Sequence, residues 1–310
     1  MKPRKCVTFD WALKRLLRSK ANFDILEGFL SELLEEDMKI QEILESESNK
    51  ETTEDKFNKV DLLVKNSKGE LIIIEVQYES QVDYLHRMLY GTSKLISEHM
   101  KKSLEYDNVK KVISINLLYF DLGNGEDYVY IGKTKFVGKH KRDELGLNER
   151  QKELYGKEQI ENIYPEYYII KINKFDDIAK DSLDEWIYFL KNGEVKKEFK
   201  ARGLEKANEE MSVMKLDEEE RKNYERHIEQ KRYENSMITS KYKEGKLEGR
   251  QEGREEGMAK GRQEGRQEGR EEERKKTIKK MLKSGMQPQE IAEILGVAEE
   301  KIRAAVGDVR

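Results

Sequence analysis

The strongest constraint on the fold is a pair of β-branched and aliphatic runs, residues 60–64 and 71–77, separated by a turn that contains Asn-Ser-Lys-Gly. Runs of this kind around such a turn predict two antiparallel strands. Folding about the turn brings Asp61 opposite or next to Glu75. Glu75 and Gln77 share a strand face because residues two apart point the same way. The hairpin therefore predicts two acids and an amide at one edge of an apolar core.

Two acids side by side at the edge of an apolar core require a physical explanation. Like charges directly across a strand pair are destabilising, and an unpaired buried carboxylate costs several kcal/mol. A divalent cation between the acids removes both penalties, and oxygen ligands of this type suit Mg²⁺ or Mn²⁺. Other interpretations remain open: Asp61 alone can be satisfied by turn amides, and Lys59 or Arg87 can give Glu75 a structural ion pair.

This arrangement resembles the core of the PD-(D/E)xK nucleases, in the branch of nuclease-family transposases and recombination-promoting nucleases. Two positions depart from the motif, since Val60 stands in place of Pro and Gln77 in place of Lys; Gln at the second position is typical of this branch. The resemblance covers nearly the whole chain, and its matching segments are 9–14, 74–77, 86–90, 111–116, 167–172 and the Glu-Gly-Arg tail.

The resemblance implies an α/β restriction-endonuclease-like core, in which a mixed central sheet is flanked by helices. It also implies a metal-dependent DNA endonuclease whose catalytic residues are Asp61, Glu75 and Gln77. The metal, Mg²⁺ or Mn²⁺, would be held by Asp61, Glu75 and the backbone carbonyl of Val76.

Four further residues are candidates for support of this site. Asp10 resembles a helical acid that completes many such sites, although a solvated helix position explains it almost as well. Lys14, one turn later, can contact a phosphate or pair with Asp10. Arg87 and Tyr90 lie on one side of the helix after Gln77, where they can meet a DNA strand or simply pack.

Composition limits the remaining possibilities. The chain of 310 residues is 36% hydrophobic and 40% charged, so we expect a compact apolar part beside a solvated part. The net charge of −3 excludes a uniformly basic coat, and DNA contacts must come from local Lys and Arg clusters. The chain has a single cysteine, Cys6, which cannot form a disulfide within the chain, and it has no apolar run of the roughly 20 residues that span a bilayer. These two features predict a cytoplasmic protein without a membrane partner.

Apolar periodicity predicts the elements of the core in chain order. A nearly continuous apolar strand in this series should be covered on both faces, as in a mixed or parallel sheet. The expected elements are two helices over 9–46, the hairpin, a helix over 81–102, that apolar strand over 109–122, a polar turn-rich stretch over 123–160, a strand over 167–173 and a helix around 186–190.

From about residue 201 the chain becomes rich in Glu, Lys and Arg, which predicts a nuclease-like domain over 1–200 and a charged helical linker over 201–276. Glycine stands at every fourth position from Gly245 to Gly269, and seven glycines at about 1 kcal/mol each make an isolated helix doubtful. A helix with this glycine groove could instead associate with a second chain as a coiled coil. The tail thus predicts either a homo-oligomer or a solvated spacer.

Residues 277–310 regain apolar periodicity, and 288–297 is similar to the first helix and turn of a helix-turn-helix unit. The next helix would begin with Glu299 and Glu300, which would face phosphates. This favours a packing or assembly role over DNA reading.

Together these features predict a DNA endonuclease of the recombination-promoting or transposase-like type. The alternative is a weak or inactive nuclease fold that binds DNA or assembles through its tail.

Overall fold

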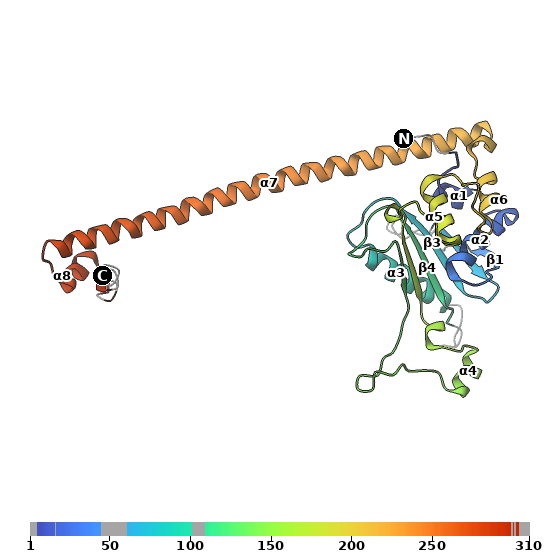
Figure 1. Ribbon diagram of the computed structural model, residues 1–310, viewed down its shortest axis with the longest axis horizontal. Helices are drawn as coiled ribbons and strands as arrows, with labels where there is room; N and C mark the ends of the chain where they lie inside the picture. The colour runs from blue at the N-terminus through green and yellow to red at the C-terminus, as the bar shows by residue number, and fades with distance from the viewer. Residues whose placement is uncertain are drawn as a thin grey trace. The chain divides into compact units, whose positions relative to one another are not determined.

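A computed structural model of the chain describes residues 5–15, 17–44, 61–100, 109–298, 300 and 302–303. Val60, which stands in place of the motif proline, and Lys59, the alternative partner of Glu75, lie outside the described residues. The chain divides into two compact units, residues 1–231 and 232–310 (Figure 1).

The first unit contains a six-stranded sheet in the order β1-β2-β3-β4-β6-β5. β3, β4 and β6 are parallel to one another, whereas β1, β2 and β5 pair antiparallel with their neighbours. A mixed sheet flanked by helices confirms the α/β nuclease-like architecture. The strands are β1 (Ile40–Leu44), β2 (Leu62–Asn66), β3 (Leu71–Gln77), β4 (Val112–Leu118), β5 (Val129–Gly132) and β6 (Glu166–Lys171). The helices are α1 (Phe9–Arg15), α2 (Phe23–Leu34), α3 (Tyr84–Met100), α4 (Glu149–Tyr155), α5 (Ser182–Asn192), α6 (Leu204–Glu210), α7 (Glu218–Lys283) and α8 (Pro288–Leu295).

The predicted hairpin is β2 and β3. Its turn is closed by the side chain of Asn66, whose Oδ1 accepts hydrogen bonds from the backbone N–H groups of Lys68 at 3.1 Å and Glu70 at 2.8 Å. Gly69 has a φ of 77°, a left-handed conformation that favours glycine. The turn residues therefore fix the register of the two strands.

The two faces of the sheet bury different residues. Alternate residues of β3, Ile72, Ile74 and Val76, join the main core with α1, α2 and α5. Leu71 and Ile73 point to the other face, where Leu95 of α3 packs. Every residue of β4 is buried, as predicted for a strand covered on both faces.

Two edge strands differ from the predicted pattern. Residues 40–44, expected to end a helical region, form β1: α2 stops at Glu35 in the left-handed conformation, and Glu27 Oε1 accepts from the N–H of Ile40 at 3.0 Å. The stretch 123–160 holds the short strand β5 and the helix α4. Both strands are half-polar edges without a long apolar run, so tertiary pairing decides their structure.

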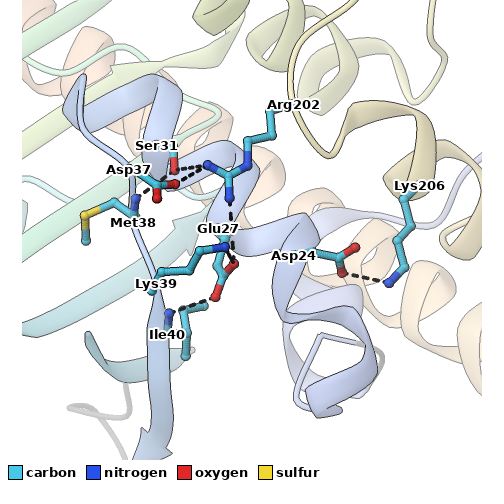
Figure 2. A network of polar contacts seen from close by, with 9 residues as sticks. All are labelled: Asp24, Glu27, Ser31, Asp37, Met38, Lys39, Ile40, Arg202 and Lys206. Atoms are coloured by element: carbon cyan, nitrogen blue, oxygen red, sulfur yellow. Dashed lines mark hydrogen bonds and ion pairs between the residues drawn. The ribbon is translucent and has the colours of Figure 1, made fainter. Parts of the chain in front are cut away.

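The segment after α5 belongs to the first unit, whereas the sequence suggests a domain end at residue 200. Its apolar side chains join the main core, and Figure 2 shows the polar contacts that tie it to α2. Arg202 contacts Asp37 and donates to Ser31 Oγ at 3.4 Å, and Lys206 lies 2.7 Å from Asp24. A Cβ on Gly28 would come within 2.2 Å of the Arg202 carbonyl oxygen, so glycine permits this close approach. The buried members of the segment are Ala201, Leu204, Ala207, Met211, Leu216 and Tyr224.

α7 continues through the glycine repeat without a break, as expected for a charged helical tail, although the seven glycines made an isolated helix doubtful. A Cβ at any of the seven glycines would meet nothing within 4 Å. The residues between the glycines are mostly Glu, Gln, Arg and Lys, which favour helix. In the second unit, Ile278 near the end of α7, Ile291 of α8 and Ile302 after α8 form a small apolar cluster. No helix in the part of the chain that the structure describes is long and apolar enough to cross a membrane.

Candidate active site

The hairpin brings the two predicted acids together. Leu62 pairs with Ile74, so the next position in this register sets Asp61 opposite Glu75. Both acids lie on the face of the sheet that α3 covers, since they alternate with the residues of the main core. The side chains are 17% and 14% exposed, so water reaches them only in part.

Asp61 is held by one backbone and one side-chain donor. Its Oδ2 accepts a hydrogen bond from the N–H of Val76 at 2.8 Å. Its Oδ1 lies 3.0 Å from Nζ of Lys14 on α1, and this lysine is 51% exposed. Lys14 therefore pairs with the site acid Asp61, which leaves a half-exposed ammonium at the mouth of the acid pair.

The negative charge of Glu75 is less well compensated than that of Asp61. Burial, more than any other effect, raises the pKa of Glu75, and the nearby charge of Asp61 raises it further, while Arg87 opposes both. The Arg87 guanidinium is 3.9 Å from Oε2, a long contact for an ion pair. The Tyr84 hydroxyl lies 3.5 Å from the same oxygen and 3.0 Å from Oδ1 of Asn116, to which it donates. Glu75 is thus a partly buried acid whose nearest cation among the described residues is the Arg87 guanidinium at 3.9 Å.

The remaining predicted residues lie around this pair. The Gln77 amide donates to the backbone carbonyl of Glu79 at 3.4 Å, a weak bond that leaves the side chain free to turn. Arg87 also donates to Gln81 at 3.1 Å. Tyr90 is 53% exposed on α3. Arg87 contacts Glu75 and Lys14 contacts Asp61, so each acid of the pair has one cation near it.

Asp10 does not pair with Lys14 but forms a second cluster next to the acid pair. Its Oδ1 accepts from the Tyr78 hydroxyl at 3.2 Å, and its Oδ2 lies 2.9 Å from Nε2 of His227 and 2.6 Å from Nζ of Lys231. Burial by itself would raise the pKa of Asp10, but the His227 hydrogen bond and the Lys231 charge outweigh it and hold the pKa well below its usual range. Lys231 also lies 3.4 Å from the centre of the Tyr78 ring.

Sequence reasoning missed His227 and Lys231, because both lie on α7 in the segment taken for a linker. The signal was present: Tyr224, Ile228 and Lys231 recur at helical spacing in an otherwise charged stretch. Burial lowers the pKa of Lys231, while Asp10 opposes that shift. The start of α7 therefore lies beside the acid pair, close enough for the charges of Lys14 and Asp61 to act on Lys231.

The donor set at the acid pair fits a divalent cation. No group of three or more His, Cys, Asp or Glu side chains in the described ranges is arranged to hold a metal ion. Mg²⁺ commonly uses only one or two carboxylates and completes its shell with water and substrate phosphate. Two opposed carboxylates, one with a raised pKa and its nearest cation at 3.9 Å, provide this kind of site.

The fold and the acid pair define an α/β protein of the nuclease-like class. A model of the PD-(D/E)XK nuclease family transposases matches residues 7–241, and the chain belongs to that family. The match includes the first turns of α7, in agreement with their packing in the first unit. No curated protein and no solved structure matches the chain.

Proposed function

We propose that the protein is a Mg²⁺-dependent DNA endonuclease that hydrolyses phosphodiester bonds. The observation that carries this proposal is the pairing of Asp61 with Glu75, with Lys14 and Arg87 as the flanking cations. Membership of the nuclease family supports DNA as the substrate.

Asp61, Glu75 and the carbonyl of Val76 would hold the cation, with Mn²⁺ as a substitute for Mg²⁺. A bound divalent cation supplies polarisation of the phosphodiester and a water of lowered pKa. Gln77 shares the face of Glu75 and would orient the attacking water through its amide. It brings no charge, unlike the lysine of the wider motif.

The charge that Gln77 lacks would come from the neighbouring cations. Lys14 is half-exposed and already faces Asp61, so it can turn to a phosphate oxygen without unfolding α1. Arg87 is 25% exposed on α3 and can offset negative charge on the reacting phosphate. Tyr90 would contact the DNA strand beside them. With few cations involved, binding should be modest and should weaken as salt rises, by an amount that grows with the number of phosphate contacts.

A cleavage assay with supercoiled plasmid tests the proposal. We expect the wild-type chain to nick the plasmid with Mg²⁺ and to lose this activity in EDTA. Asp61→Asn is the matched variant, because asparagine keeps an oxygen for the Val76 N–H and removes only the charge. Equal cleavage with and without EDTA, or by Asp61→Asn at the wild-type rate, would refute the proposal.

One alternative has its own support. Gln77 is neutral, and Lys14 already neutralises Asp61, so the fold could bind DNA with little or no turnover. In that case DNA would be retained in a gel-shift assay while the plasmid stays intact with Mg²⁺ and with Mn²⁺.

The tail and the C-terminal unit have separate proposed roles. The exposed glycine repeat of α7 could associate with the same repeat of a second chain, and the unit around α8 would serve packing or assembly. Both roles can be lost without loss of the acid pair.

A further inference from the structure

The end of α1 and the turn after it form a basic stretch beside the acid pair. Residues 11–23 contain no acid, and their cations are Lys14, Arg15, Arg18 and Lys20. The acids on either side of the stretch, Asp10 and Asp24, are engaged by other cations of the fold, on α7 and α6. The positive charge of the stretch is therefore not balanced by acids close to it in the sequence.

Two of these cations meet at the same residue of the acid pair. Nζ of Lys14 lies 3.0 Å from the carboxylate of Asp61, and Nη2 of Arg18 donates to the main-chain carbonyl of Asp61 at 3.4 Å. Arg18 thus lies next to the site but contacts neither carboxylate of the acid pair. The sequence alone did not single out this arginine, because its contact with Asp61 is tertiary.

Most of the binding capacity of Arg18 is unused. A guanidinium carries five N–H donors and a permanent positive charge. A neutral carbonyl engages one of these donors and does not offset the charge. Arg15, Arg18 and Lys20 are all exposed, and none of them forms an ion pair with a residue that the structure describes. These three cations are therefore available to an anion from solution.

The backbone that presents Arg18 is anchored on both sides. Leu17 is fully buried in the main core, and its N–H donates to the carbonyl of Ala12 at 2.9 Å. After Arg18, the N–H of Asn22 donates to the carbonyl of Ser19 at 2.9 Å. Binding at Arg18 would therefore cost side-chain freedom but little backbone freedom.

We propose that Arg18, with Arg15 and Lys20 beside it, forms a subsite for the DNA phosphate next to the one that is cut. The inference rests on the proposed function, which supplies DNA as the ligand. Lys14 and Arg87 lie at the two carboxylates and would face the reacting phosphate, whereas Arg18 lies one step outside them. The planar fork of arginine donates to two phosphate oxygens at once. A DNA strand offers a regular series of such anions, which matches several cations in one stretch better than a single carboxylate does.

DNA binding by the full chain in EDTA tests the subsite without cleavage. Fluorescence anisotropy of a labelled duplex is measured at several salt concentrations. We expect Arg18→Gln to weaken binding by about tenfold and to lower the slope of log affinity against log salt by about 1. Arg18→Lys keeps the charge and should keep the slope. Arg150→Gln is the matched control, since Arg150 is an exposed arginine on α4 in the same unit, and it should keep both affinity and slope.

Three results would overturn the subsite. They are an unchanged salt slope for Arg18→Gln, an equal loss in Arg150→Gln, and a wild-type chain that does not bind DNA. Arg18 is exposed, so its variants should melt at the wild-type temperature. If Arg18→Gln does not fold, the double variant Arg15→Gln/Lys20→Gln provides the same test, and an unchanged slope in that variant also refutes the subsite.

Cleavage separates this inference from the proposed function. With Mg²⁺ and saturating protein, Arg18→Gln should nick plasmid within about threefold of the wild-type rate, because a neighbouring phosphate is held equally in the ground state and the transition state. A loss of about 10²-fold at saturation would place Arg18 at the reacting phosphate and overturn the assignment. Intact plasmid with a salt slope that depends on Arg18 refutes the nuclease proposal alone. Nicked plasmid with an unchanged slope refutes the subsite alone.

Discussion

Asp10 and Glu75 are both buried carboxylates in the same unit, yet their pKa values move in opposite directions. Burial pushes both upward. For Asp10, a histidine at 2.9 Å and a lysine at 2.6 Å reverse the effect. For Glu75, the arginine is 3.9 Å away and Asp61 adds a second negative charge, so the pKa stays raised.

The comparison distinguishes an acid whose charge is compensated by close cations of the same chain from an acid whose charge is compensated only at longer range. Asp10 has its partners within the chain and joins α1, β3 and α7. Glu75 has only two long contacts, to Arg87 at 3.9 Å and to the Tyr84 hydroxyl at 3.5 Å, so its negative charge is only partly compensated. Burial alone would have assigned the same role to both, and the difference lies in which opposite charges are within reach.

The largest expected effect is a loss of DNA cleavage in the Glu75→Gln variant. The substitution keeps the shape of the side chain and removes the charge that would hold the cation, so we expect the rate to fall by about 10³-fold, or about 4 kcal/mol of transition-state stabilisation. The measurement is plasmid nicking at saturating Mg²⁺. Asp10→Asn is the control that tests the comparison: its cleavage per folded molecule should stay within about tenfold of wild type. Equal losses in both variants would place Asp10 in the site.

The second effect is on stability. Asp10→Asn leaves the Lys231 ammonium buried without its negative partner, which should cost about 3 kcal/mol in the free energy of unfolding. The folded-state pKa of Asp10 is depressed, so its contribution is present above the ordinary pKa of aspartate and is lost as the pH falls through the folded value. The difference between variant and wild type should therefore be largest near neutral pH and should shrink in acid.

Urea denaturation followed by circular dichroism measures this difference. Adding Lys231→Met removes the stranded cation and should restore part of the lost stability. If Asp10→Asn unfolds at the wild-type urea concentration, the cluster does not hold α7 to α1.

The local pattern predicted the hairpin and its acids because both depend on residues close together in the sequence. The alternation in β2 and β3 and the Asn66 turn determine the register, and the register sets Asp61 against Glu75. The buried strand β4 followed from a continuous apolar run. The edge strand β1 could not be predicted from its local pattern, because its partner strand β2 is not adjacent to it in the sequence.

The partners of the acids were harder to predict, because they come from distant segments. Lys14 was expected either to contact a phosphate or to pair with Asp10 on the same helix, but it pairs with Asp61. Asp10 instead meets Lys231, more than two hundred positions later in the chain. Helical spacing shows which residues can be neighbours on one helix, whereas tertiary packing decides which neighbour is used.

The third prediction concerns Gln77, which shares the strand face of Glu75. If its amide orients the attacking water, Gln77→Leu should lower cleavage by about 10²-fold, the weak end of such effects. Gln77→Lys should preserve or raise the rate, because it restores the cation of the wider motif beside the raised-pKa glutamate. Single-turnover rates on one plasmid substrate compare the three proteins. Equal rates for Gln77→Leu and wild type would show that the side chain takes no part.

The smallest expected effect is on the metal-free stability of Glu75→Gln, and it tests the comparison directly. The folded-state pKa of Glu75 is raised, so the ionised side chain destabilises the fold near neutral pH. Removing one of two facing charges should therefore stabilise the EDTA-treated protein by up to about 1 kcal/mol at neutral pH. The gain should vanish as the pH falls below the ordinary pKa of glutamate, where wild-type Glu75 is itself neutral. Asp10→Asn should show the opposite sign under the same conditions. Urea midpoints at two pH values decide the matter: a loss of stability in both variants would mean that Arg87 compensates Glu75 as fully as Lys231 compensates Asp10.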